Sequence, residues 1–226
     1  MHDRLNSKGL EVGKSGVGGM LRKMVVHDRI HSLEFKSELR HRFYVELKAS
    51  YWHSFEEGLA YPSTVIRLDT SVNRAMDHTH EAVEDFKFIE QSLPAYSFGP
   101  QKLNNALLRV PLLGGLVRFI LFQNVLNTYD ILVNFISGRK MAIGMLDNLY
   151  AQDEGLDEQE QGFVSEIKQE IYTSIVEAEK YLRENVITMW PEVTVAANQH
   201  RTAYSVLVQQ KNYVNRMHDE GQVDDA

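Results

Sequence analysis

The sequence contains no cysteine among its 226 residues. This absence excludes a disulfide scaffold, a Cys-ligated zinc site, an iron–sulfur cluster and thiolate catalysis. Proline is scarce, with 5 residues, and the nearest candidate for an alternating strand is the short stretch Val193–Ala197. Basic residues are outnumbered, 24 Lys and Arg against 31 Asp and Glu, so the net charge of -7 argues against a nucleic-acid-binding protein.

Recognisable catalytic and nucleotide-binding motifs are also lacking. Residues Gly9–Ser15 look like a phosphate-binding loop, but only three residues separate Gly9 from Gly13, where that loop requires four. The sequence has no Gly-x-Ser-x-Gly elbow for a nucleophilic serine. We therefore expect no catalytic residue, no cofactor and no bound metal, and we predict that the chain is not an enzyme.

Apolar side chains recur at helical spacing through most of the chain. One stripe repeats every four residues and ends at Gly58, shortly before Pro62: Leu39, Phe43, Leu47, Tyr51 and Phe55. Similar stripes predict helices over 65–89, 116–150 and 163–182, and a short helix is expected over 102–109. Asp157 and Glu160 resemble a capping box, and Pro191 suits the first turn of a last helix that ends near Gly221.

These patterns predict an all-α fold, an elongated bundle of five or six helices. Residues 1–20 are rich in glycine and are expected to form a flexible leader. The helical domain is expected over residues 21–221, followed by a short tail over 222–226.

Charged residues are unevenly distributed along the chain. Residues 1–50 contain 10 Lys and Arg against 6 Asp and Glu, whereas residues 147–226 contain 6 against 16. A basic segment suits the anionic inner leaflet of a membrane, and an acidic segment suits water or a basic partner. Two differently solvated surfaces explain the same pattern, so charge alone leaves these interpretations open.

The most apolar stretch, Val110 to Ile136, is long enough to cross a bilayer. Polar residues interrupt it, among them Arg118, Gln123, Asn124, Asn127 and Asp130. A charged side chain at the bilayer centre costs about 2.5–3.5 kcal/mol on insertion scales. We therefore expect a buried or membrane-surface helix rather than a membrane span.

The stretch from Asp77 to Asp85 is the best candidate for a metal site. On a helix, its carboxylates would share one side and His78 and His80 would point elsewhere. The Glu-x-x-His pairs of helical di-metal sites are absent from this stretch, so a solvated charged face is the preferred interpretation. A helical metal-dependent enzyme is kept as the least favoured alternative, with these ligands: Asp77, His80, Glu81 and Glu84.

Three stretches together carry a family resemblance. Residues 46–77 contain Ala-Ser-Tyr-Trp and Glu-Glu-Gly blocks, residues 107–146 form an apolar run, and residues 189–214 contain Trp-Pro-Glu-Val and Thr-Ala-Tyr-Ser-Val-Leu blocks. In this order and spacing they resemble the cytosolic helical region of plasma-membrane sodium/proton antiporters, of the plant salt-overly-sensitive type and its protist and sperm-type relatives. The likeness covers roughly residues 20–221. The residues that we single out in it are Tyr51, Trp52, Glu57, Gly58, Pro191 and Tyr204.

The resemblance implies a regulatory and dimerisation domain at the cytosolic face of the plasma membrane. In that family, acidic residues of a membrane domain exchange sodium for protons, and those residues lie outside this chain. The implied partners are that membrane domain and a second copy of the chain, and the basic first quarter could contact the inner leaflet. A cyclic-nucleotide-binding-like domain often follows in the family, and it would begin near Asp224, so the chain is expected to be a fragment or a stand-alone relative.

Two further expectations accompany this interpretation. A stand-alone helical adaptor in the cytoplasm, which binds a basic partner through its acidic 147–226 half, is the main alternative. Tyr51 and Trp52 are large enough to hold the first helix against the second, although ordinary core packing is the more common role of such aromatic residues.

Overall fold

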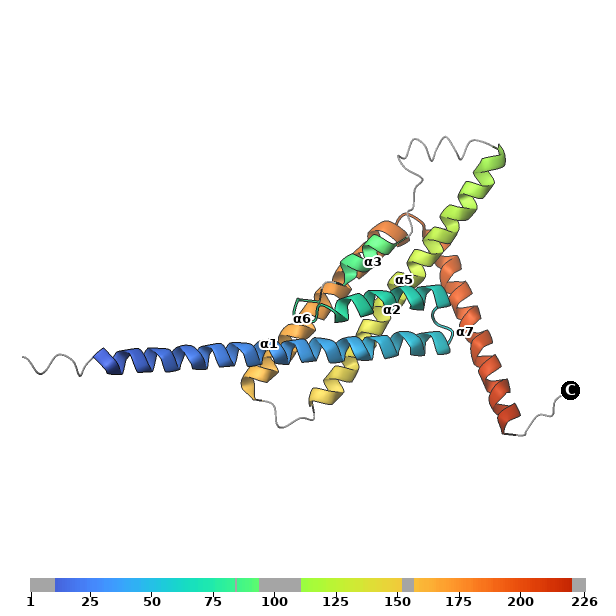
Figure 1. Cartoon of the computed structure of the whole chain (residues 1–226). Helices are drawn as coiled ribbons and strands as arrows, with labels where there is room; N and C mark the ends of the chain where they lie inside the picture. The colour runs from blue at the N-terminus through green and yellow to red at the C-terminus, as the bar shows by residue number, and fades with distance from the viewer. Residues whose placement is uncertain (1–10, 84, 94–110, 152–156, 221–226) are drawn as a thin grey trace, which may run out of the picture.

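The computed structural model describes residues 11–83, 85–93, 111–151 and 157–220, and every regular element within these ranges is helical. Within the described ranges, six α-helices and one π-helical turn follow one another, and Figure 1 shows their arrangement. They are α1 (Glu11–Glu56), α2 (Pro62–Met76), α3 (Phe86–Ser92), α5 (Pro111–Ala151), α6 (Glu158–Tyr181), η1 (Leu182–Ile187) and α7 (Pro191–Asp219). The predicted all-α bundle of five or six helices is confirmed.

Helix α5 is the centre of the bundle, because it contacts α1, α2, α6, η1 and α7. Its middle is apolar on most sides, with Val125, Leu132 and Phe135 almost completely buried. Such burial is the main favourable term in folding, at roughly 25 cal/mol per Å² of apolar surface. The first part of α5 and the end of α7 extend away from this centre (Figure 1).

Helix α1 is 46 residues long, and most of its predicted apolar stripe is buried. Leu39, Phe43 and Leu47 are at most 3% exposed. The helix begins at Glu11, inside the segment predicted to be a flexible leader, while residues 1–10 lie outside the described residues. Glycine within a helix costs only about 1 kcal/mol relative to alanine, so a glycine-rich segment does not by itself end a helix.

The predicted second helix over 65–89 is divided in two. Helix α2 ends at Met76, the described residues 77–83 form turns and bends, and α3 begins at Phe86. Polar contacts hold the connection against other helices, because Arg40 of α1 donates to the Thr79 carbonyl and the Val83 amide donates to Glu170 of α6. Apolar spacing alone did not reveal this break. The helix predicted over 102–109 lies outside the described residues.

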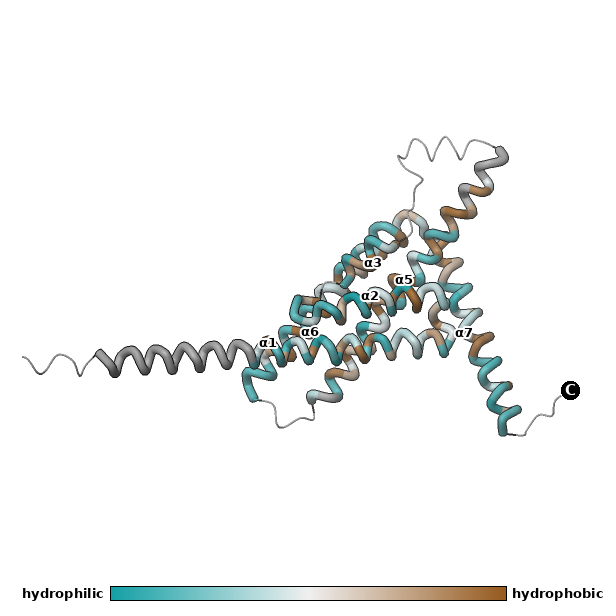
Figure 2. The backbone as a smooth tube through the Cα atoms, viewed as in Figure 1, coloured by the Kyte–Doolittle hydropathy of each residue, from teal (hydrophilic) through white to brown (hydrophobic). Residues whose placement is uncertain are grey.

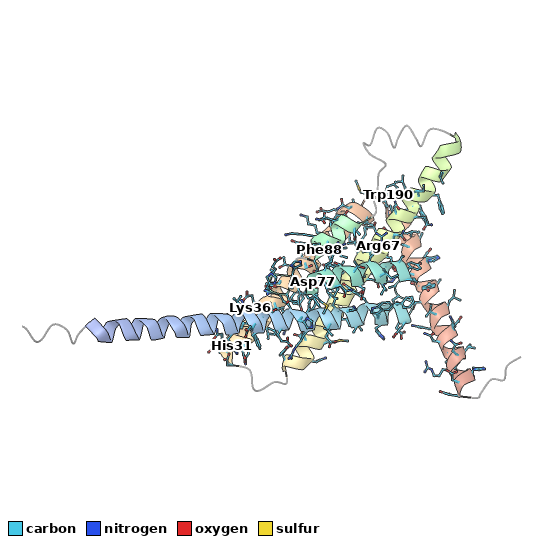
Figure 3. The ribbon with its side chains drawn as sticks, in the orientation of Figure 1. His31, Lys36, Arg67, Asp77, Phe88 and Trp190 are labelled. Atoms are coloured by element: carbon cyan, nitrogen blue, oxygen red, sulfur yellow. The ribbon has the colours of Figure 1, made fainter. Side chains whose placement is uncertain are left out.

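Helices α6 and α7 begin where the sequence predicts. Asp157 and Glu160 form a complete capping box, in which each side chain accepts a hydrogen bond from the other residue's backbone amide. A π-helical turn, η1, then leads to Trp190, and Pro191 occupies the first turn of α7. Figure 3 labels Trp190 at this joint, and it also labels Lys36, whose ammonium group pairs with Glu166 of α6 at 2.6 Å.

One described helical segment, Phe119–Asn148 of α5, is long and apolar enough to cross a membrane. Half of its most apolar window is buried inside the bundle, as in a core helix. Its two buried charged residues, Asp130 and Arg139, both have partners from other helices or turns. The buried half of the helix thus packs as part of the core.

Candidate functional site

A cavity of about 640 Å³ lies where the start of α2, the first half of α5 and the first half of α7 meet. Apolar and aromatic side chains form most of its wall, among them Phe122, Leu126 and Ala196. Polar groups from all three helices also line it, including Asp130 of α5 and Arg201 of α7. A concave, mainly apolar site with a few polar groups is typical of small-molecule binding.

Asp130 is the buried acid of this site, with 3% of its surface exposed. Its Oδ2 accepts hydrogen bonds from the Thr64 hydroxyl at 2.5 Å and the Tyr61 amide at 3.4 Å, and its Oδ1 accepts one from Asn134 Nδ2 at 3.1 Å. Burial raises the pKa of Asp130 above its ordinary value, because the charged form is desolvated. Thr64, Arg201, the Tyr61 amide and Asn134 oppose that rise.

Asn134 connects this acid to the cation of the site. Its amide nitrogen donates to Asp130 Oδ1 and to the Leu59 carbonyl, and its amide oxygen accepts from Arg201 Nη2 at 3.1 Å. The orientation of the amide is therefore determined by its partners on both sides. Arg201 is half-buried beside the cavity, and this one hydrogen bond holds its guanidinium group against α5.

An aromatic cluster closes the side of the cavity formed by α7. The Tyr61 ring lies 5.3 Å from the Tyr204 ring and 6.0 Å from the His200 ring. The Tyr61 hydroxyl also forms a hydrogen bond with His200 Nδ1. Burial raises the pKa of Tyr61, so the hydroxyl stays protonated at neutral pH and is able to donate to the imidazole.

Below this cluster, α7 binds the end of α1. The last carbonyls of a helix have no partner within it, and here side chains of α7 supply the missing donors. Ser205 Oγ donates to the Glu57 carbonyl at 3.0 Å, and Asn212 Nδ2 donates to the Glu56 carbonyl at 3.2 Å. Gly58 has a φ of 69°, and a Cβ placed there would lie 2.7 Å from Val208 Cβ. Glycine is therefore required at position 58 by both its backbone conformation and its close approach to α7.

Three of the residues singled out by the family resemblance lie at this junction: Glu57, Gly58 and Tyr204. Pro191 lies at the start of α7. Trp52 reaches α2, since its Nε1 donates to Asp69 Oδ1 at 3.2 Å, but 42% of its surface is exposed. Tyr51 is 1% exposed and packs against α5 beside Gly138, in agreement with the core-packing role that is more common for such residues.

Sequence reasoning missed the polar residues of the cavity. Tyr61, His200 and Arg201 carry no local motif, and the only available signal was Asp130, an acid within an apolar stretch. Their roles depend on contacts between segments 66 or more residues apart. An acid within an apolar stretch is therefore the one signal that the sequence gives for this site.

The histidine-rich turn after α2 differs from its expected geometry. The donor atoms of His78, His80 and Glu81 lie within 4.8 Å of one another, and all three residues are exposed. The two histidines do not point away from Glu81 because the segment forms turns rather than a helix. Of the other alternative ligands, Asp77 is not in this group and Glu84 lies outside the described residues.

Asp85 was expected on a solvated face and is instead buried. It forms an ion pair with Arg139 of α5, and both side chains are at most 1% exposed. The Arg139 guanidinium carbon lies 3.7 Å from the Phe135 ring centre. Burial alone would lower the pKa of Arg139, and the adjacent Asp85 raises it above its ordinary value. This pair belongs to the core, and neither residue lines the cavity described above.

Comparisons with known proteins add no assignment. No protein-family model matches the chain, and no curated protein matches it.

Proposed function

We propose that the chain is a cytosolic helical domain of a sodium/proton antiporter, which serves regulation and dimerisation while the transport residues lie outside it. The observation that carries this proposal is that the three stretches of the family resemblance form one structural unit. Their described residues contribute the end of α1 with α2, the central α5, and α7. Helix α5 contacts α1, α2 and α7, and α1 contacts α2.

Exposed apolar side chains support a role in assembly. Leu116 and Phe119 on the protruding part of α5, and Leu207 and Val214 on α7, are each more than half exposed. Figure 2 shows apolar residues along the protruding part of α5 and a shorter apolar patch on α7, whose far end is mainly hydrophilic. Clustered apolar surface is unfavourable in water and is commonly covered by a protein partner or a membrane.

The coding sequence around the gene tests the proposal directly. We expect the transcript to continue upstream of Met1, in the same reading frame, into a region that encodes several apolar helices. A functional test then follows: the extended protein should exchange sodium for protons in vesicles, and deletion of residues 189–214 should impair that exchange. An in-frame stop codon directly upstream, within an untranslated leader, would contradict the proposal.

A further inference from the structure

We propose that the cavity between α2, α5 and α7 binds a small monocarboxylate with an apolar body, and that the ligand's carboxylate pairs with Arg201. This inference is independent of the antiporter proposal, because it rests only on the cavity and on the groups that line it. A volume of about 640 Å³ falls within the usual range for small-molecule sites.

The apolar part of the wall selects the body of the ligand. Phe122 and Leu126 from α5, Pro62 from α2 and Ala196 from α7 surround the cavity. A hydrophobic group placed among these side chains leaves water, which is favourable at roughly 25 cal/mol per Å² of apolar area. The aromatic rings of Tyr61 and Tyr129 line the same space and suit either an aryl or an alkyl group.

The polar part of the wall selects the charged end. Asp130 is already engaged, because its two oxygens together accept three hydrogen bonds from the protein. Arg201 donates one hydrogen bond, to Asn134, and its charge also acts on the nearby Asp130, but no carboxylate of the described residues lies within ion-pair distance of it. A guanidinium group carries five N–H donors and no acceptor, so the charged group that is still available at this wall is a donor.

A carboxylate is the ligand group that fits those donors. Arginine binds carboxylates through two parallel N–H bonds, which are stronger than bonds between neutral groups. The amides of Gln123 and Asn127 and the imidazole of His200 line the same cavity and supply further donors. An organic cation would instead be repelled by Arg201. It would also find no free acid to pair with, because Asp130 is buried and already accepts hydrogen bonds from the protein.

Calorimetric titration of the whole chain with four probes tests this assignment. 3-Phenylpropanoate and octanoate carry the proposed head group on an aryl or an alkyl body, 3-phenylpropanamide removes the charge, and octylamine reverses it. We expect one binding site per chain for at least one carboxylate, with the amide and the amine roughly ten-fold weaker or worse. The better of the two carboxylates identifies the aryl or alkyl body as the preferred one.

Three variants assign the binding to the cavity. Arg201→Gln should weaken carboxylate binding by roughly ten-fold or more and leave binding of the amide probe nearly unchanged. Arg201→Lys keeps the charge but loses the two parallel N–H donors, so its carboxylate affinity should lie between those of the wild type and Arg201→Gln. Ala196→Phe fills the cavity from its half-exposed wall and should weaken all probes. Arg216→Gln, on the exposed end of α7, is the matched control and should change nothing.

Circular dichroism confirms that each variant remains helical before titration. The assignment is overturned if no carboxylate binds with one site per chain, if octylamine binds as tightly as octanoate, or if a folded Arg201→Gln variant retains full carboxylate affinity.

Discussion

At the scale of single residues, the interior of the bundle depends on one fully buried ion pair. Asp85 and Arg139 are both at most 1% exposed, and the Arg139 guanidinium also donates to the Tyr51 hydroxyl at 3.4 Å. Removal of one partner from a buried pair leaves an uncompensated charge, which costs about 3–5 kcal/mol. The main effect of Asp85 is therefore to neutralise the buried charge of Arg139.

We expect Asp85→Ala to lower the free energy of unfolding by about 3–5 kcal/mol, because Arg139 is left buried without its counter-ion. Urea denaturation followed by circular dichroism measures the change. Glu38→Ala is the control: it breaks the exposed pair with Arg42, whose side chains are about half exposed, and should cost no more than about 1 kcal/mol. Equal losses in the two variants would show that burial of the pair has no special effect.

Two glycines of α5 form a second matched pair. A Cβ at Gly138 would lie 2.8 Å from Tyr51 Cδ1, whereas a Cβ at Gly144 would meet nothing within 4 Å. We expect Gly138→Ala to destabilise the fold by about 1–3 kcal/mol through overpacking. Gly144→Ala should stabilise it by about 0.5–1 kcal/mol, because alanine favours the helix. Denaturation midpoints of both variants test the opposite signs, and a stabilising Gly138→Ala would contradict the close packing of Tyr51.

Asp130 makes the stability of the fold depend on pH. Its pKa in the fold is raised above 3.8, the ordinary value, so the fold favours the protonated acid. The stability that this group contributes is complete below pH 3.8 and is lost as pH rises through the raised pKa. The wild-type chain should therefore lose stability relative to Asp130→Asn over this window, and the difference should become constant above it.

Denaturation of both proteins at steps from about pH 4 to 8 measures that difference, and other titrating groups cancel in the comparison. A difference that grows in favour of the wild type as pH rises would mean that the hydrogen bonds to the carboxylate outweigh its burial.

At the scale of elements, local signals explain where several helices begin and end. The capping box of Asp157 and Glu160 starts α6, Pro191 starts α7, and Gly58 follows the end of α1. Each of these signals works through atoms within a few residues, so each was visible in the sequence. The break between α2 and α3 had no such signal, because Glu170 and Arg40 hold it from other helices.

The capping box gives a test at this scale. Asp157→Ala removes the acceptor for the Glu160 amide, which lies 2.7 Å from Asp157 Oδ1. We expect a loss of about 0.5–2 kcal/mol in the free energy of unfolding, together with faster amide hydrogen exchange in the first turn of α6. Gln159→Ala, an exposed change in the same turn, should have little effect. Similar exchange in both variants would show that the cap does not stabilise the helix start.

At the scale of the whole molecule, the extended parts of α5 and α7 carry apolar side chains that are more than half exposed, among them Phe119 and Leu207. If the chain serves dimerisation as proposed, it should self-associate, and light scattering at rising concentration should approach twice the monomer mass of 26.0 kDa. If the two copies associate through apolar surfaces, the association should persist at high salt. An association through exposed charges would instead weaken as salt is added. A mass of 26.0 kDa at every concentration would remove the support for dimerisation.

The all-α class, the buried stripe of α1 and the starts of α6 and α7 follow from the order of residues alone, because helical periodicity and capping act between neighbours in the chain. The pairing of buried polar groups does not. Asp85 meets Arg139 across 54 residues and Thr64 meets Asp130 across 66. These pairs, and the cavity beside Arg201, form only when the helices pack together. The physical reason is that a buried charge pairs with whichever group lies close to it in space, and the spacing of residues in the sequence does not reveal that group.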